Sequence, residues 1–173
     1  AILSGYKYLY TSTANTMYHR VLEFDISNEN EWVCIDSFQP QGNGDYTGIT
    51  YDPVEDTIWI LHNQNRRIQS YTVSATGDFE RGDQYFTFQT STSSIWQCGV
   101  TNQQARGLEM NQTHFFMRCQ DGNYYNDRDQ LETWGRSGSA VALIPENTVR
   151  SISSLGYGLF YDGRRFITVD SGY

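Results

Sequence analysis

The sequence predicts an all-β fold built from short antiparallel strands, and three observations lead to this prediction. Apolar residues alternate with polar ones or form short runs, and Gly, Asn, Asp and Ser separate these runs. Aromatic residues make up 15% of the chain, which favours a packed core over disorder. Related segments recur along the chain. We therefore expect a single all-β domain over residues 1–173.

The first half of the chain contains seven expected strands. Segments 6–11 and 21–26 alternate their side chains, and 32–35 is a short apolar run that begins with Trp. Strand 48–51 leads into 57–61, which concentrates Ile, Trp and Leu. Two further segments rich in aromatic or β-branched residues complete this half, at 68–73 and 85–88.

The second half contains six expected strands with the same two patterns. Strand 107–110 begins with a glycine, and 114–117 is an aromatic and apolar run. The remaining four are 130–134, 140–144, 158–161 and 165–169. Alternating strands of about five residues are typical of antiparallel sheet.

An internal repeat organises these strands. Three segments share a glycine, an alternating strand, an Asp or Asn turn and a second apolar strand, and they begin at Gly48, Gly107 and Gly158. The glycines are 59 and 51 residues apart. A repeat of this length with four short strands per unit indicates the blades of a β-propeller. The expected fold is therefore β-propeller-like, with antiparallel four-stranded repeats and about three and a half units; a β-sandwich with a coincidental repeat is the alternative.

Residues 48–73 carry a resemblance to a known repeat family. The segment reads Gly-Ile-Thr-Tyr-Asp-Pro, then Ile-Trp-Ile, then Asn-Arg-Arg-Ile-Gln-Ser-Tyr. This order resembles the NHL and YWTD types of β-propeller repeat, with Arg-Ile-Gln in the place of the third strand of a blade. The resemblance implies a propeller blade and transfers no site residues.

The length of the chain is awkward for this fold. At about 50 residues per unit, 173 residues exceed three blades and fall short of four, which is the usual minimum. We expect either a fragment of a larger propeller, half units that complete one another, or strands supplied by a second copy. A homo-oligomer or filament is therefore the expected assembly.

Charge and composition limit the partners and the compartment. The chain has 20 acidic and 12 basic residues, a net charge of −8 and no basic stripe, which argues against nucleic acid and anionic lipid. Its apolar runs are too short for a membrane-spanning helix. It begins at Ala1 without a signal-like segment, which fits a removed or omitted leader. The Lys-poor, neutral-polar composition favours a secreted protein, in which the sequon at Asn111 becomes a glycosylation site.

Three cysteines are present, which leaves at least one without an intramolecular partner. We expect a disulfide between Cys98 and Cys119, which lie 21 positions apart, with Cys34 as a core residue. Three buried thiols are the alternative. Neither a Cys-x-x-Cys pair nor a paired-histidine motif supports a zinc site.

Two sets of residues are candidates for ligand binding. Oxygen-bearing side chains in the segment 121–132 have part of the spacing of a calcium loop, without its glycine or flanking helices. The calcium candidates are Asp121, Asn123, Asp127, Asp129 and Glu132. Aromatic residues with polar neighbours suit carbohydrate stacking. These carbohydrate candidates are Trp96, Tyr124, Tyr125 and Trp134.

No nucleophile, metal or cofactor motif stands out, so we expect a non-enzymatic protein without a cofactor, calcium being the one candidate ion. The predicted function is a secreted module for binding or assembly, with a glycan or a protein as partner. The alternatives are a structural subunit of an extracellular or viral filament, and a calcium-assisted propeller hydrolase.

Overall fold

The structure is a computed structural model that describes most of the predicted strands. The described residues are 2–3, 8–12, 21–28, 30–38, 46–62, 66–73, 79–88, 104–120, 130–135, 142–150 and 159–168. Within them all regular structure is β-strand, so the all-β prediction is confirmed there. No helix in this described part is long and apolar enough to cross a membrane.

Fourteen strands are described, and the thirteen predicted ones are among them, with shifted ends. They are β1 (Ile2–Leu3), β2 (Tyr8–Ser12), β3 (Val21–Asp25), β4 (Val33–Phe38), β5 (Tyr46–Asp52), β6 (Thr57–His62), β7 (Arg67–Val73), β8 (Phe79–Phe88), β9 (Gln104–Met110), β10 (His114–Gln120), β11 (Gln130–Gly135), β12 (Ala142–Arg150), β13 (Leu159–Tyr161) and β14 (Phe166–Thr168). Only the two-residue strand β1 was not predicted.

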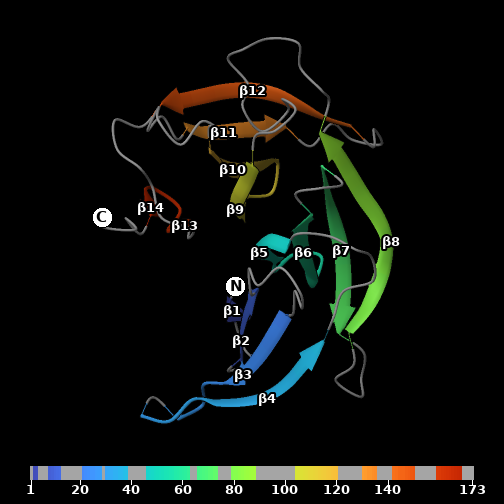
Figure 1. The fold of residues 1–173 in the computed structure, drawn as a ribbon, viewed down its shortest axis with the longest axis vertical. Helices are drawn as coiled ribbons and strands as arrows, with labels where there is room; N and C mark the ends of the chain where they lie inside the picture. Colours follow the sequence, from blue (N-terminus) through green and yellow to red (C-terminus); the bar gives the residue numbers. More distant parts are fainter. Residues whose placement is uncertain are drawn as a thin grey trace.

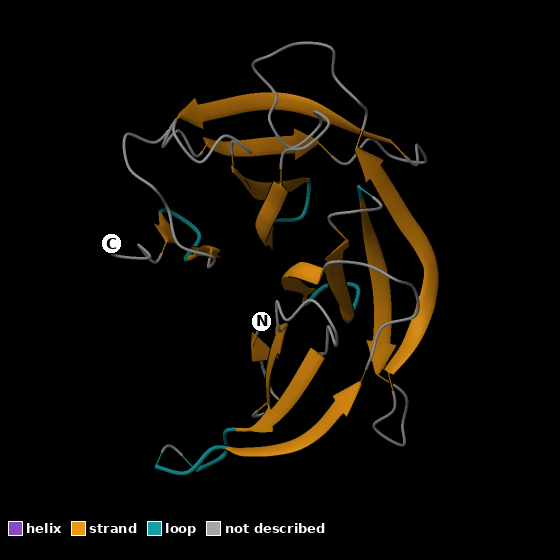
Figure 2. Ribbon diagram, viewed as in Figure 1, coloured by secondary structure: helices purple, strands orange, loops and turns teal. Residues whose placement is uncertain are grey.

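The strands form successive antiparallel meanders (Figure 2). The first sheet has the order β1-β2-β3-β4, and an eight-stranded sheet follows with the order β5-β6-β7-β8-β12-β11-β10-β9. We call its two halves the second sheet (β5 to β8) and the third sheet (β9 to β12), and the pair β13 and β14 the fourth. A two-residue parallel pairing of Ala142 with Thr87 and Leu143 with Phe88 joins β12 to β8. The second and third sheets are thereby linked at their outer strands.

The four sheets are arranged around a common centre (Figure 1). β5 and β9 lie near the middle, whereas β4, β8 and β12 lie at the periphery. The first strands of the second and third sheets contact each other, and β9 also contacts β13. No strand pairing joins the first sheet to the fourth among the described residues, so these residues do not form a closed ring.

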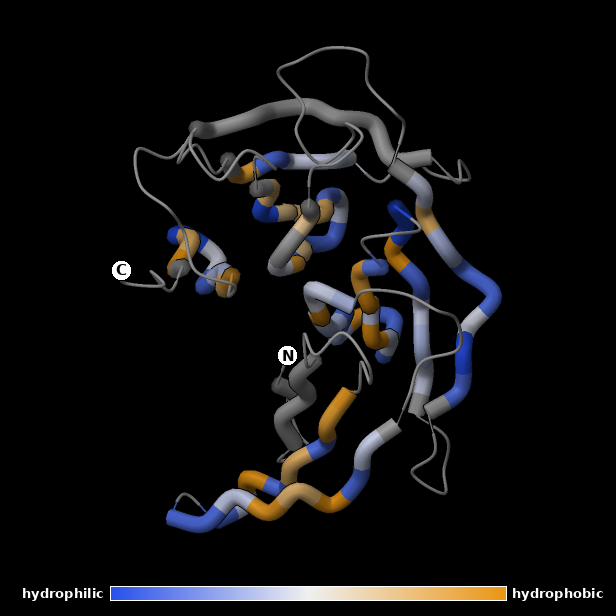
Figure 3. Tube along the Cα trace, in the orientation of Figure 1, coloured by the Kyte–Doolittle hydropathy of each residue, from blue (hydrophilic) through white to orange (hydrophobic). Residues whose placement is uncertain are grey.

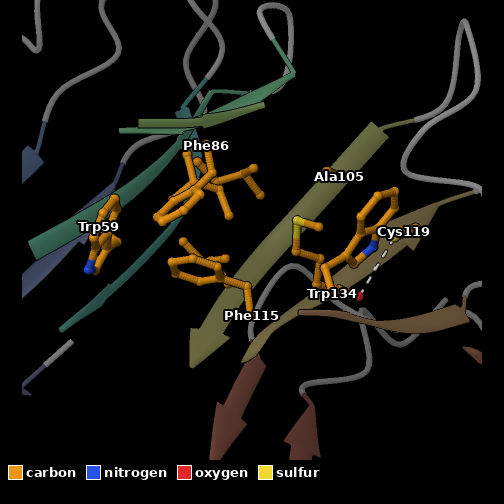
Figure 4. Packing of buried hydrophobic residues seen from close by; sticks show 10 residues of the cluster. Trp59, Phe86, Ala105, Phe115, Cys119 and Trp134 are labelled. Carbon is orange, nitrogen blue, oxygen red and sulfur yellow. Dashed lines mark hydrogen bonds between the residues drawn. The ribbon is translucent and has the colours of Figure 1, made fainter. Parts of the chain in front are cut away.

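The larger core lies between the second and third sheets (Figure 4). Trp59, Phe86 and Phe115 form its aromatic centre, with ring centroids 5.3–5.6 Å apart. The other buried members are Leu61, Ile68, Ala105, Leu108, Met117, Cys119 and Trp134. Aromatic contacts at these distances add to the free energy gained by burying the rings.

A second core lies between the first and second sheets. Val21 of β3 packs there with Ile58 and Ile60 of β6, together with Tyr46 and Tyr71. All six residues of β6 are buried, because this strand has the first sheet on one face and the third on the other. In Figure 3 hydrophobic residues occur on β6 near the middle and also on β3 and β4 at the lower edge, while β8 is mostly hydrophilic.

The fourth sheet packs on the third through aromatic residues. The ring of Phe116 on β10 lies 5.3 Å from that of Tyr161 and 4.8 Å from that of Phe166, measured between centroids. Each sheet therefore contacts the next one along the chain.

The repeated glycine has a steric explanation. A Cβ atom on Gly48 would lie 2.7 Å from the backbone nitrogen of Leu108 and 2.9 Å from the carbonyl carbon of Gly107. Gly107 itself has a φ of 71°, in the left-handed region that favours glycine. β5 and β9 thus approach so closely that neither glycine is readily replaced.

The repeated Asp or Asn has the same role in three units. Oδ1 of Asp52 accepts hydrogen bonds from the backbone N–H groups two and three residues later, at 2.9 and 3.3 Å. Asn111 does the same at 2.9 and 2.8 Å, and Asp162 at 2.8 and 2.6 Å. Each side chain holds the turn between the first and second strands of its sheet.

Cys34, which was expected in the core, is an exposed free thiol on β4. Trp32, just before β4, is 59% exposed. The physical reason is that β4 is the outermost strand of its sheet, with β3 as its strand neighbour among the described residues. The prediction that Cys34 is a core residue was therefore wrong.

Candidate interaction surface

Trp134 is not an exposed stacking surface. Its side chain is fully buried in the core of the third sheet, and its indole Nε1 donates a 2.9 Å hydrogen bond to Oε2 of Glu132. The prediction of Trp134 as a carbohydrate contact is therefore corrected, since a sugar needs access to the ring face. The other three candidates, Trp96, Tyr124 and Tyr125, lie outside the described residues.

Glu132 is also fully buried, with its carboxylate bound to the indole of Trp134. No group of three potential metal ligands occurs among the described residues. The other calcium candidates, Asp121, Asn123, Asp127 and Asp129, lie outside the described part, so the calcium loop remains a prediction.

Cys119 is fully buried on β10. Cys119 is disulfide-bonded; Cys98 lies outside the described residues, so its identity as the partner remains a prediction.

Asn111 serves the turn between β9 and β10. Besides two backbone N–H groups, its Oδ1 accepts a 3.2 Å hydrogen bond from Oγ1 of Thr113, the hydroxyl residue of the sequon. Gln112 and Thr113 are exposed and Asn111 is half-buried. This arrangement occupies the amide oxygen, whereas a glycan would attach through the amide nitrogen; glycosylation stays a prediction.

One carboxyl group near the middle of the molecule is perturbed. Oγ1 of Thr50 on β5 donates a 3.1 Å hydrogen bond to Oε2 of Glu109 on β9, which joins the second and third sheets. Burial raises the pKa of Glu109 from its ordinary 4.5 to about 7, although the hydrogen bond from Thr50 opposes this rise. Sequence reasoning missed this pair because Glu109 occupies an alternating position in an ordinary strand.

Glu109 is expected to make stability depend on pH. Between pH 4.5 and about 7 the folded state binds more protons than the unfolded state, so the free energy of unfolding falls as pH rises and levels off above pH 7. Glu109→Gln removes this loss. At pH 8 the variant should be more stable than wild type by about 1–2 kcal/mol, allowing for partial solvent contact, and at pH 5 nearly equal to it.

Urea unfolding at both pH values measures the difference. Glu55→Gln, an exposed turn residue on the neighbouring sheet, is the matched control and should leave the pH dependence unchanged. An identical pH dependence in wild type and Glu109→Gln would contradict the expectation.

Exposed apolar residues gather on the first and last sheets. Trp32, Val33 and Ile35 at β4 are at least half exposed. On the last sheet, Phe160 of β13 and Ile167 of β14 are direct cross-strand partners, 53% and 50% exposed. Because side chains alternate between faces, this pair lies opposite Tyr161 and Phe166, which pack on the third sheet. We call Phe160 and Ile167 the outer pair.

Comparisons with known proteins give little further information. No protein-family model matches the chain, and no curated protein matches it. The chain is similar to a solved structure described as the complex of KlAtg21 with the coiled-coil of AgAtg16, at 7% identity and a TM-score of 0.39. The match covers 78% of this chain and 50% of that one, so the chain spans about half its length. A similarity this weak carries no argument.

Proposed function

We propose that the protein is a non-catalytic β-propeller-like module of three and a half units that works by assembly, with a second copy of the chain covering its last sheet. Three consecutive four-stranded meanders around a common centre support the propeller-like arrangement. The exposed outer pair, Phe160 and Ile167, is the observation that carries the assembly.

The pattern of contacts between the sheets supports a further sheet on this face. The first three sheets pack on their neighbours through the two cores, and the fourth packs on the third through Phe116. The outer pair presents the same kind of apolar cross-strand surface on the opposite face of the fourth sheet. The outer pair thus continues the packing pattern of the sheets. Among the described residues, no further sheet covers it.

The first sheet supplies a complementary face. Val21 points toward the second sheet, so alternation places Leu22 and Phe24 on the other side of β3. Both are half-buried. Contact between the last sheet of one copy and the first sheet of the next is head-to-tail, and such contacts generate a ring or a filament.

Association should therefore depend on the outer pair. Covering the exposed halves of two large apolar side chains stabilises a contact by about 2 kcal/mol, or about 30-fold in affinity. In sedimentation velocity across a concentration series, the wild-type chain should associate. The Phe160→Ser/Ile167→Ser double variant should reach the same degree of association only at an about 30-fold higher protein concentration.

Val54→Ser is the matched control, because Val54 is 71% exposed in the turn between β5 and β6, on another sheet. It should associate as wild type does. A wild-type chain that stays monomeric at all concentrations, or a double variant that associates equally well, would refute the proposed assembly.

A further inference from the structure

One face of the second sheet changes character along its strands. Ile58 and Ile60 on β6 pack toward Val21 of the first sheet. His62 follows on the same face of β6, and its cross-strand partners are Tyr46 on β5 and Arg67 on β7. The apolar surface therefore gives way to a row of polar groups where β6 ends and β7 begins.

His62 is buried without a hydrogen-bond partner. Its side chain has no solvent exposure, and neither Nδ1 nor Nε2 makes a hydrogen bond. The ring of Tyr46 lies edge-on, 4.3 Å away between centroids. A neutral imidazole has one donor and one acceptor, and leaving both unmet in the interior is unfavourable. Buried groups of this kind indicate a bound water or ion.

Two arginines of the neighbouring strands lie on the same face of the sheet as His62, Arg67 as its cross-strand partner and Arg81 as the partner of Tyr71. Arg67 is held 5.4 Å over the ring of Tyr85, and its Nε is buried without a hydrogen-bond partner. Nη2 of Arg81 donates a 3.2 Å hydrogen bond to Oε1 of Gln69, which is a neutral group. Among the described residues, no carboxylate forms an ion pair with either arginine. Two positive groups therefore lie on this face of the second sheet in a chain of net charge −8.

We propose that His62, Arg67 and Arg81 form a binding site for a small oxyanion. The Nε–H of Arg67 and one ring N–H of His62 supply donors that now lack an acceptor, and Arg81 supplies charge from the exposed side. A hydrogen bond with a charged donor or acceptor is roughly twice as strong as one between neutral groups, and carboxylate, sulfate and phosphate are charged acceptors. Full burial of His62 favours a small anion over an acidic segment of another protein.

Anion binding should be coupled to protonation of His62. Burial, with the charges of Arg67 and Arg81, lowers the pKa of His62 to about 4. A bound anion offsets those charges and raises this pKa, so affinity should increase as pH falls from 7 toward 4. The other titratable groups on this side are Tyr46, Tyr71, Tyr85 under Arg67 and, on β3, Glu23; burial raises the pKa of Tyr46 and of Tyr71, and Glu23 has a partner.

The experiment titrates the protein with sulfate, phosphate and acetate at constant ionic strength, below the concentration at which it associates. Thermal stability reports binding, and the NMR signals of the His62 ring report the site. We expect saturable stabilisation, a rise in the pKa of His62, and at least about tenfold weaker binding in Arg67→Gln. Comparing acetate with sulfate and phosphate distinguishes a carboxylate from an inorganic oxyanion.

Arg164→Gln is the matched control, since it removes the same charge from an exposed turn and should bind as wild type does. Arg81→Gln is the second site variant, and it keeps the test valid if Arg67→Gln fails to fold. Stabilisation that does not saturate and is equal in the site variants and the control would overturn the proposal. A His62 ring signal that is insensitive to anions would also overturn it, because the buried ring would then contact water instead of an anion. Neither outcome bears on assembly through the outer pair.

Discussion

Gly48→Ala is expected to destabilise the protein by about 3 kcal/mol. The added methyl group would lie 2.7 Å from the backbone nitrogen of Leu108 and 2.8 Å from its Cβ. Backbone atoms cannot turn aside as the end of a flexible side chain can, so β5 and β9 must separate. That separation also disturbs the 2.5 Å hydrogen bond from Oγ1 of Thr47 to the carbonyl oxygen of Ala105. Chemical unfolding of the variant measures the loss.

Gly163→Ala is the informative control for this prediction. Gly163 has a φ of 90°, but nothing lies within 4 Å of its added Cβ. Its substitution should cost about 1 kcal/mol through backbone strain alone. If Gly48→Ala cost no more than Gly163→Ala, the close approach of β5 and β9 would not be the reason for the repeated glycine.

Trp134→Ala is expected to destabilise the protein by about 3–5 kcal/mol, the range for removing a large buried aromatic side chain. The indole fills the core between the second and third sheets, and its removal also takes the Nε1 donor away from the buried carboxylate of Glu132. Thermal unfolding should show a fall of about 10 °C in Tm.

Trp32→Ala is the matched variant, because it removes the same side chain from a site that is 59% exposed. It should change the free energy of unfolding by about 0.5 kcal/mol or less. Equal losses in the two variants would show that the third sheet is not packed around Trp134.

Local patterns in the sequence were sufficient to predict most of the strands. Alternation predicted β3 and β7, and the repeated Gly and Asp marked places where backbone geometry leaves few choices. The polar middle of β8, in contrast, is held through the side chain of Gln69. Its Nε2 donates to the carbonyl oxygens of Gly82 at 2.7 Å and Gln84 at 2.9 Å, where β8 bulges and residues 82–84 lie opposite Ser70 of β7. That support comes from another strand, so alternation within β8 could not reveal it.

The candidate sites were harder to predict because burial depends on which sheet lies opposite. Trp32 and Trp134 each occur in a predicted strand next to a β-branched residue, Val33 or Thr133, yet one is exposed beside an outermost strand and the other is enclosed. A single histidine such as His62 gives no motif, and Arg67 and Arg81 are 14 positions apart in the sequence. Only the pairing of β6 with β7 and of β7 with β8 brings these three together.

The meander order of the sheets has a consequence for how the chain folds. Every strand pairs with its neighbour in sequence, apart from the two-residue parallel contact between β8 and β12. Each sheet can therefore form from a continuous stretch of chain with short loop closures, which are entropically inexpensive and fast. The slow step would then be docking of preformed sheets, and the tight crossing of Gly48 with Gly107 is a backbone contact that this step has to form together with the core.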